Sequence, residues 1–505
     1  IYDHYYFNFI SPISRQKLED LASTALQSNC NKSVHRVFDQ YLNFISLEDD
    51  LFVLKHQNSE TISYYAINRG DVQDTEIDSV MNHIVDSLFS LFVTLGVVPI
   101  IRSQKDNAAE MVAQKLDKKI RENLKDVRNN LFTTSTSGDI FQQGNIPLSF
   151  QRPLLVLLDR NMDMATPLHH TWTYQALTHD VLDLKLNQVK IQDSDSTDKN
   201  INGGTRPKRS NVKVFDLNPS DKFWQQHKGS PFPQVAEAVQ EELESYRASE
   251  EEVKRLKTEM GLDNSVPDET ITLLSDNTAK LTSAVSSLPE LLEKKRIIDM
   301  HTTIATSILD QIKHRKLDTY FEIEEKVMSK TMLDNKSLNE ILLDPSSGSI
   351  SDKMRLFLIY YLYNSQSLSE SDLKQLTSAL EESGCDLNAY HFIKRWKTYS
   401  KLPFGDTQYS LHNHGGGTKT VSMFSKLMSQ GSQFVMEGVK NLVVKKHSLP
   451  ITKIVDAFME MKSLPEIEDY HYFDPKLHKV NVTDNVTNRN RTPFQDVSIA
   501  RVIIK

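Results

Sequence analysis

The chain has 505 residues, a length that predicts roughly three domains. Hydrophobic residues make up 39% of it and charged residues 25%, values typical of a globular protein. The net charge of −8 argues against nonspecific binding to nucleic acid, because neutralising phosphates requires a basic face. Its two cysteines, Cys30 and Cys385, exclude a disulfide framework and a thiolate zinc site, and favour a reducing compartment.

The chain begins and ends with apolar, core-like segments, so we expect it to be part of a longer protein. A targeting segment therefore cannot be judged from this N-terminus. The longest apolar stretch, 88–101, contains Ser90, Thr94 and Pro99. It is shorter than the ~20 residues that a membrane span needs, so no membrane-spanning helix is expected.

Two short amphipathic helices are predicted near the N-terminus. Leu18, Leu21 and Ala22 recur at helical spacing, and Val34 and Val37 begin a second such pattern that continues to residue 42. A short strand is predicted at 52–54.

Strands and helices alternate from residue 77 to residue 184, which predicts an α/β domain. A helix capped by Thr75 is expected to end at Gly96, followed by a strand at 97–101 and a long helix at 111–127. The apolar run at 153–158 is typical of a buried parallel strand. Thr166 and Pro167 then predict a helix start.

The second half of the chain is predicted to be mainly helical. Residues 188–213 are polar and predict a loop, whereas 234–330, 353–363 and 387–401 carry helical patterns. A glycine- and histidine-bearing loop is expected at 403–418. The final stretch has strand-like ends that are able to return to the α/β sheet.

Asp159 and Asp163 directly follow the buried strand, where α/β enzymes place catalytic groups. One hypothesis is a phosphotransfer or metal-binding carboxylate pair. The favoured interpretation is a structural turn in which Asp159 bonds to Arg160 or to backbone amides, because no phosphate loop or partner base is nearby.

Three histidines lie shortly after Asp163 in the sequence, and neither they nor two further motifs indicate a cofactor. His169, His170 and His179 lack metal-ligand spacing, so core histidines are favoured. Residues 415–420 resemble a phosphate loop but lack its spacing, and the basic cluster at 206–209 is favoured as a solvated loop over a nuclear signal. No catalytic constellation and no metal site is expected.

The segment 419–446 is amphipathic with a cationic rim. Its apolar positions include Phe424, Leu427, Phe434, Val435, Val439 and Leu442. Bulky apolar residues beside lysines suit a membrane surface or a movable lid, and packing onto the helical domain is an equal alternative.

Several segments resemble the SM family of syntaxin-binding, vesicle-fusion proteins. The run at 153–184, PLLVLLDRNMDMATPLHHTWTYQALTHDVLDL, resembles the central family signature. Its matching positions are Asp159, Arg160, Asp163, Pro167, His170, Gln175 and Asp180. Six further segments resemble the ER-to-Golgi, Sly-type branch: 38–45, 222–237, 274–295, 352–361, 431–443 and 472–476.

The resemblance implies an α/β plus α-helical fold, a multidomain arch with Rossmann-like parallel sheets in domains 1 and 2 and a large helical domain 3. Residues 1–55 would be the remainder of domain 1, and 56–221 the first part of domain 2. Residues 222–450 would be domain 3 with the loop 403–447, and 451–505 a return to domain 2.

The resemblance also implies a function without catalysis or cofactor. The protein would bind a Golgi syntaxin of the syntaxin-five type and its cognate SNAREs, and promote SNARE assembly in ER–Golgi transport, including retrograde transport. It would be a monomeric, cytoplasmic protein at ER and Golgi membranes and vesicles, with tethering complexes as further partners.

The family's functional surfaces match particular positions here. The syntaxin N-terminal peptide would dock on Leu18, Leu21, Ala22, Val34 and Val37, although these residues are also able to form core. A helical hairpin at about 279–325 would template SNARE helices, and the 419–446 stretch would be a lid or membrane contact. The alternative function is an α/β hydrolase or phosphotransferase built on Asp159, Asp163 and His170.

Overall fold

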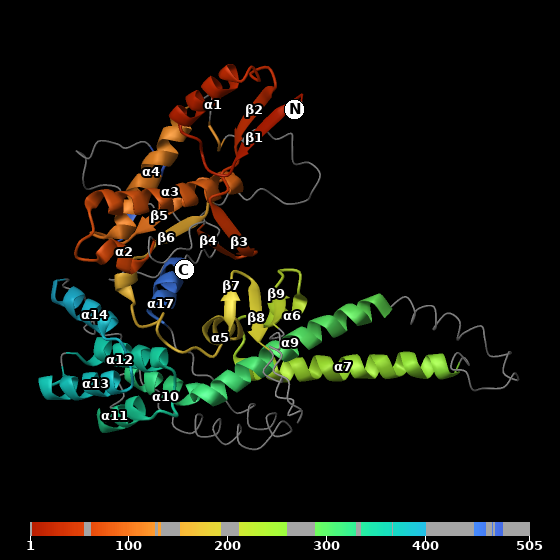
Figure 1. Ribbon diagram of the computed structural model, residues 1–505, viewed down its shortest axis with the longest axis vertical. Coiled ribbons are helices and arrows are strands. Elements are labelled where there is room, and N and C mark those ends of the chain that lie inside the picture. The colour runs from red at the N-terminus through yellow and green to blue at the C-terminus, as the bar shows by residue number, and fades with distance from the viewer. Residues whose placement is uncertain are drawn as a thin grey trace, which may run out of the picture. The chain divides into compact units, whose positions relative to one another are not determined.

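A computed structural model describes residues 3–54, 62–126, 130–132, 152–192, 212–259, 288–329, 335–365, 367–399, 449–460, 467 and 470–477. The chain forms two compact units, one of Ile1–Asp163 with Ser448–Lys505 and the other of Met164–His447. Figure 1 shows their elements. Within the described residues, none of the helices combines the length and apolar character needed to cross a membrane. The predicted domain boundaries near residues 55, 221 and 450 remain predictions.

The first unit combines small sheets with helices. Its elements are β1 (Tyr5–Phe9), α1 (Arg15–Gln27), β2 (Val34–Asp39), β3 (Phe44–Glu48), β4 (Leu51–Leu54), α2 (Tyr64–Asn68), α3 (Asp74–Leu95), β5 (Ile100–Ser103), α4 (Ala108–Lys125), β6 (Leu154–Leu157), α17 (Pro450–Met459) and β10 (His471–Phe473). The predicted helix over 34–42 is wrong, because β2 is a strand paired in parallel with β1. Its β-branched and aromatic residues favour a strand, and short apolar runs fit either pattern.

The α/β part of this unit follows the predicted alternation. Strands β5 and β6 pair in parallel, and β10 adds to β5 in antiparallel orientation. The helix α3 ends at Gly96, whose φ of 66° is left-handed, as predicted. Its N-terminus is capped at Gln73 rather than Thr75, because the Glu76 carboxylate accepts the Gln73 amide at 3.1 Å. Buried residues of α3, α4, β5 and β6 form one core.

Three arginines hold the C-terminal segment of this unit. Arg152 makes two bonds of 2.6 and 2.8 Å to the buried Asp474 carboxylate. Arg121 donates to the Asp474 carbonyl at 2.5 Å. Arg102 donates to the Ile467 carbonyl at 3.1 Å. Arg102 also lies over the ring of Phe458, which adds a cation–π contact.

The second unit begins with a turn and a small antiparallel sheet. Its first elements are α5 (Tyr174–Val181), β7 (Asp183–Lys185), β8 (Gln188–Gln192) and β9 (Val212–Asp216). The predicted loop over 188–213 is wrong at both ends, because Val189 and Ile191 alternate with polar residues and are buried. The residues between these strands lie outside the described part of the chain.

The predicted helix start at Thr166 and Pro167 is also wrong. The chain makes a single turn there, and α5 begins only at Tyr174. The reason lies in the hydrogen bond of His170, whose amide donates to the Glu324 carboxylate at 2.8 Å instead of to a helical carbonyl.

The described residues in the rest of this unit are mainly helical, as predicted for 234–330, 353–363 and 387–401. Its helices are α6 (Lys222–His227), α7 (Phe232–Glu259), α9 (Leu288–Arg315), α10 (Leu317–Met328), α11 (Asn335–Leu343), α12 (Ile350–Asn364), α13 (Glu370–Glu382) and α14 (Asn388–Tyr399). The long helices α7 and α9 lie side by side (Figure 1). The first half of α7 and the middle of α9 share a core with α5 and the small sheet.

Candidate functional site

The predicted peptide-binding residues come from α1 and β2. Ser14 caps α1 by accepting the Lys17 amide, and Leu18, Leu21 and Ala22 share one helix face. Ala25 is the buried residue of this helix, whereas Leu18 is 37% exposed and Ala22 is exposed. This face of α1 is therefore open enough to contact a ligand.

Val34 and Val37 lie on the same face of β2, although an odd separation normally places strand residues on opposite faces. A β-bulge causes this, because Val34 lies opposite Tyr5 and Val37 lies opposite Phe7, whereas His35 lies opposite no residue of β1 in the strand register. Tyr5 and Phe7 share a face, with ring centroids 6.4 Å apart. The two valines are half-buried beside these rings. They share one face, as predicted, but on a strand instead of a helix.

The signature pair Asp159 and Asp163 brackets a single 3₁₀ turn, Arg160–Met162. The Asp159 carboxylate accepts the Asn161 amide at 2.9 Å and the Ala108 amide at the N-terminus of α4. Burial raises the pKa of Asp159, and these two amide hydrogen bonds oppose the rise. Arg160 donates to the Asp163 carbonyl at 3.2 Å. Asp159 thus caps a helix and a turn, which confirms the structural interpretation.

The remaining signature residues lie in the second unit. Pro167 belongs to the turn before His169, and the Gln175 amide donates to the Lys228 carbonyl at 2.9 Å. Asp180 binds Arg355 of α12 through two bonds of 2.6 and 3.1 Å. Asp180 therefore connects α5 to α12 of the helical bundle.

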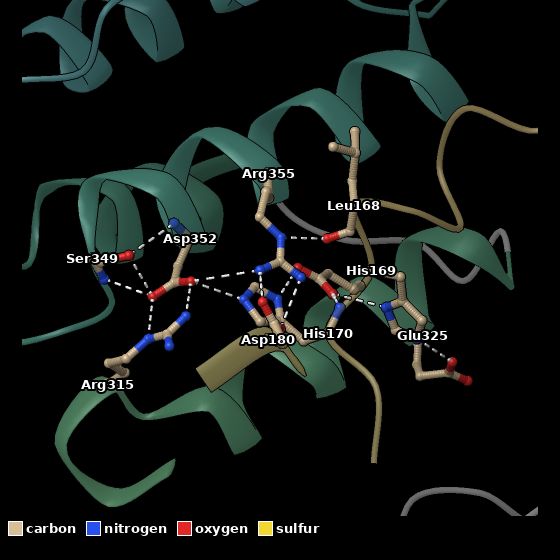
Figure 2. Close-up of polar contacts among 10 residues, drawn as sticks. Leu168, His169, His170, Asp180, Arg315, Glu325, Ser349, Asp352 and Arg355 are labelled. Atoms are coloured by element: carbon tan, nitrogen blue, oxygen red, sulfur yellow. Dashed lines mark hydrogen bonds and ion pairs between the residues drawn. The ribbon is translucent and has the colours of Figure 1, made fainter. Parts of the chain in front are cut away.

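His169 and His170 are buried, as predicted, and lie between α10 and α12 (Figure 2). The ring of His169 contacts Glu324 through Nδ1 at 2.8 Å and Glu325 through Nε2 at 3.0 Å. The ring of His170 contacts Glu324 through Nδ1 at 2.7 Å and Asp352 through Nε2 at 3.0 Å. Both nitrogens of both rings are thus occupied, which leaves no free nitrogen on His170 to act as a base.

Two arginines complete this charge network, which we define as His169, His170, Glu324, Glu325, Asp352, Arg315, Arg355 and Asp180. Arg315 donates to Asp352 from Nε at 2.9 Å and from Nη2 at 2.5 Å. Asp352 also accepts the Ser349 amide at 2.7 Å (Figure 2). Arg355 donates from Nε to the Leu168 carbonyl at 2.7 Å. The network joins five segments of the second unit: the turn before α5, α5 itself, the end of α9, α10 and α12.

The partners in the network set its protonation. Burial opposes the charged form of His169, but its hydrogen bonds to Glu324 and Glu325 outweigh that and raise its pKa to about 9. Burial alone would raise the pKa of Glu324, yet the two histidines lower it to about 2. Burial likewise opposes the ionisation of Asp352, and hydrogen bonds from His170 and Arg315 hold its pKa far below its usual range. Glu324 and Asp352 are therefore ionised at neutral pH.

A second buried polar chain anchors the middle of α9. The His301 ring contacts the Tyr174 hydroxyl through Nδ1 and the Asp221 carboxylate through Nε2, both at 2.9 Å. Burial raises the pKa of Tyr174 well above its usual value, so this hydroxyl is no nucleophile. Over the described ranges, acidic, histidine and cysteine side chains form no group suited to hold a metal ion.

Sequence reasoning missed five members of the charge network: Glu324, Glu325, Asp352, Arg315 and Arg355. One local signal existed, since Ser349 and Asp352 form the S-x-x-D pattern of a capping box, which the structure contains. The partners of the two histidines are more than 150 positions away in sequence, and no local pattern joins them. His179 is exposed rather than part of the core. The lid residues Phe424, Leu427, Phe434, Val435, Val439 and Leu442 lie outside the described residues.

Comparison with known proteins agrees with this architecture. The Sec1 family model matches residues 1–503. The human Sec1 family domain-containing protein 1 is 60% identical, covering 99% of this chain and 75% of its own. The Drosophila melanogaster protein named Sly1 homolog is 56% identical, covering 99% of this chain and 76% of its own.

Two solved structures share the fold. Sly1p, crystallised in complex with an N-terminal peptide of Sed5p, is 28% identical with a TM-score of 0.64, covering 94% of this chain and 68% of its own. The SM protein Vps45 in complex with the Qa SNARE Tlg2 (1–310) is 17% identical with a TM-score of 0.61, covering 94% of this chain and 72% of its own. The α/β plus α-helical fold and the resemblance to SM proteins are thereby confirmed, and the chain belongs to the Sec1 family.

Proposed function

We propose that this chain is a SNARE-binding regulator of vesicle docking and membrane fusion in ER–Golgi transport, and that it binds a Golgi syntaxin of the syntaxin-five type. Membership of the Sec1 family and the similarity to Sly1p, whose structure contains a Sed5p peptide, support this function. The observation that carries it is the open apolar face of α1, together with the two valines that the bulge turns to one side of β2.

We assign the syntaxin N-terminal peptide to Leu18, Leu21, Ala22, Val34 and Val37. Leu18, Leu21 and Ala22 lie one helical turn apart, and the bulge turns both valines to one side of the strand. All five are half-buried or exposed, which suits residues that a ligand covers better than residues of a closed core. An aromatic or aliphatic anchor of the peptide would bury its side chain on these faces.

The further parts of the proposal concern the other surfaces and the cellular site. The domains follow the predicted boundaries, and the hairpin at about 279–325 contacts SNARE helices. The segment 419–446 acts as a lid or membrane contact. The protein works without catalysis or cofactor as a monomer in the cytoplasm, peripherally at ER and Golgi membranes, with tethering complexes as further partners.

The test is a titration of this chain with a fluorescent peptide from the N-terminus of the Golgi syntaxin. Micromolar binding corresponds to about −8 kcal/mol, and removing one Leu-sized contact costs about 1.5–3 kcal/mol. We therefore expect Leu21→Lys to weaken binding at least tenfold. Fluorescence anisotropy at fixed ionic strength measures the change.

The matched control is Gln27→Lys. Gln27 is an exposed residue of the same helix on the side opposite Leu18, so the control adds the same charge away from the face formed by Leu18, Leu21 and Ala22. Its affinity should stay within about twofold of wild type. Equal losses of peptide affinity in both variants would show that the added charge, and not the α1 face, controls binding. Absence of binding by a folded wild-type chain would remove the peptide assignment.

A further inference from the structure

The charge network contains two neighbouring histidines whose four ring nitrogens all face carboxylate oxygens. An ionised carboxylate only accepts hydrogen bonds, so each of these nitrogens must carry a hydrogen. A neutral imidazole has one such hydrogen, whereas an imidazolium has two. The geometry therefore requires both rings to be cations.

A count of charges leads to the same result. The carboxylates of Glu324, Glu325, Asp352 and Asp180 face the guanidinium groups of Arg315 and Arg355 and the two histidines. Two guanidinium groups leave two negative charges unbalanced, and two imidazolium ions balance them. Neutral histidines would leave uncompensated charge at positions where Glu324 and Asp352 are fully buried, which is costly. The aromatic neighbours Phe321 and Tyr320 pack on the rings.

The network lies at the junction where the long helix α9 ends. Arg315 is the last residue of α9, Lys316 has a left-handed φ of 51°, and α10 starts at Leu317. Arg315 donates two hydrogen bonds to the Asp352 carboxylate. The backbone carbonyl of Arg315 accepts the Gly348 amide at 3.0 Å. The direction in which α9 leaves the bundle therefore depends on where His170 and Arg315 hold Asp352.

His301 provides the other anchor of α9, in the middle of the helix. Between the two polar anchors, Ile304, Ile308 and Ile312 of α9 lie in the apolar core that this helix shares with α7. A change in the position of Asp352 would therefore act on the C-terminal end of α9, and α7 lies beside this helix.

We propose that His169 and His170 are a pair of imidazolium cations at neutral pH that locks the root of the hairpin formed by α7 and α9, and that they act as positioning residues for the binding of SNARE helices. The second half of this inference rests on the proposed function. The first half concerns proton positions and helix direction alone, and it is tested without any SNARE.

The protonation test uses the full chain labelled with ¹⁵N-histidine at pH 7. Long-range ¹H–¹⁵N correlation spectra distinguish imidazolium from both neutral tautomers, and His169→Gln and His170→Gln identify the two rings. We expect imidazolium patterns for both. A neutral tautomer on either ring at pH 7 would overturn the assignment. Glu325→Gln, at a side chain that is 31% exposed, is a mild second variant that should move the titration of His169 to lower pH.

The lock is tested by the distance between spin labels on exposed positions of α9 and α13, Lys295→Cys and Lys374→Cys, with Cys30→Ser in the background. We expect one narrow distance distribution in the parent and a broad one in His170→Gln. The matched control is His314→Gln, an exposed histidine next to Arg315, which should leave the distribution narrow. An unchanged distribution in folded His170→Gln would refute the lock.

The functional arm measures SNARE-helix affinity and N-terminal peptide affinity in the same variants. If His170→Gln reduces the fraction of correctly directed hairpins to about a tenth, SNARE-helix affinity falls about tenfold. Peptide affinity, measured on α1 and β2, should not change. If wild type binds neither SNARE helices nor the N-terminal peptide, the proposed function alone is refuted. If His170→Gln and wild type bind SNARE helices with equal affinity, the positioning role alone is refuted.

Discussion

Raising the pH should destabilise the second unit through His169. The pKa of this ring is raised to about 9 in the folded protein, against an ordinary value of 6.5. A group whose pKa is raised on folding stabilises the protein fully below its unfolded pKa, and this contribution is lost as the pH rises through the folded pKa. The shift corresponds to about 3 kcal/mol at 1.36 kcal/mol per pKa unit. That stabilisation should be complete below pH 6.5 and absent above about pH 9.

Neighbouring groups do not reverse this slope. The pKa of His170 is also raised, which adds a loss in the same direction. The pKa of Glu324 is lowered to about 2, so its contribution is present at neutral pH and is lost only in strong acid. Between pH 6 and pH 10, the network should therefore only weaken.

Urea unfolding followed by tryptophan fluorescence suits this measurement, because Trp172, Trp224 and Trp396 all belong to the second unit. Between pH 6 and pH 10, the free energy of unfolding of wild type should fall by about 3 kcal/mol more than that of His169→Gln. Plots of this free energy against pH should converge for the two proteins near pH 9. His314→Gln, at an exposed position, should follow wild type. Parallel pH curves for wild type and His169→Gln would refute the reasoning.

Two further predictions concern the two units separately. Arg152→Ala leaves the buried Asp474 carboxylate without its two-bond partner and should destabilise the first unit by about 3 kcal/mol, measured as faster proteolytic release of the C-terminal segment. Arg152→Lys should lose less stability than Arg152→Ala. Equal rates of proteolytic release in wild type and both variants would contradict a stabilising role for the bonds between Arg152 and Asp474. Gly348→Ala should cost about 3 kcal/mol in urea unfolding, because it combines a left-handed φ of 68° with a Cβ that would clash with the Tyr320 hydroxyl. Gly384→Ala shares the left-handed φ, but its Cβ would make only an ordinary van der Waals contact with Ile350 at 3.9 Å, so it should cost about 1 kcal/mol, and equal costs would argue against the clash at Gly348.

Helices with long, regular apolar patterns were predictable from local sequence. The pattern from Ile77 to Phe92 and the glycine that follows specify α3 and its end, since the apolar spacing and the left-handed cap are local properties. The apolar run of β6 similarly predicted a buried parallel strand.

Short segments were decided by their partners. The β2 segment fits a helix or a strand by spacing, and pairing with β1 selects the strand. The bulge at His35, which turns Val34 and Val37 to one side, exists only in relation to β1. The proposed peptide site therefore places Val34 and Val37 on a strand where a helix was predicted, and the site itself stays a prediction.

The sequence by itself determined the fold class, the family and the long helices, because each depends on patterns that repeat locally or on segments that match known relatives. Tertiary structure alone decided the protonation of His169 and His170 and the capping role of Asp159. A proton follows the nearest acceptors, and for both histidines these lie on α10 and α12, more than 150 residues away along the chain. Only folding brings those charges within hydrogen-bonding distance.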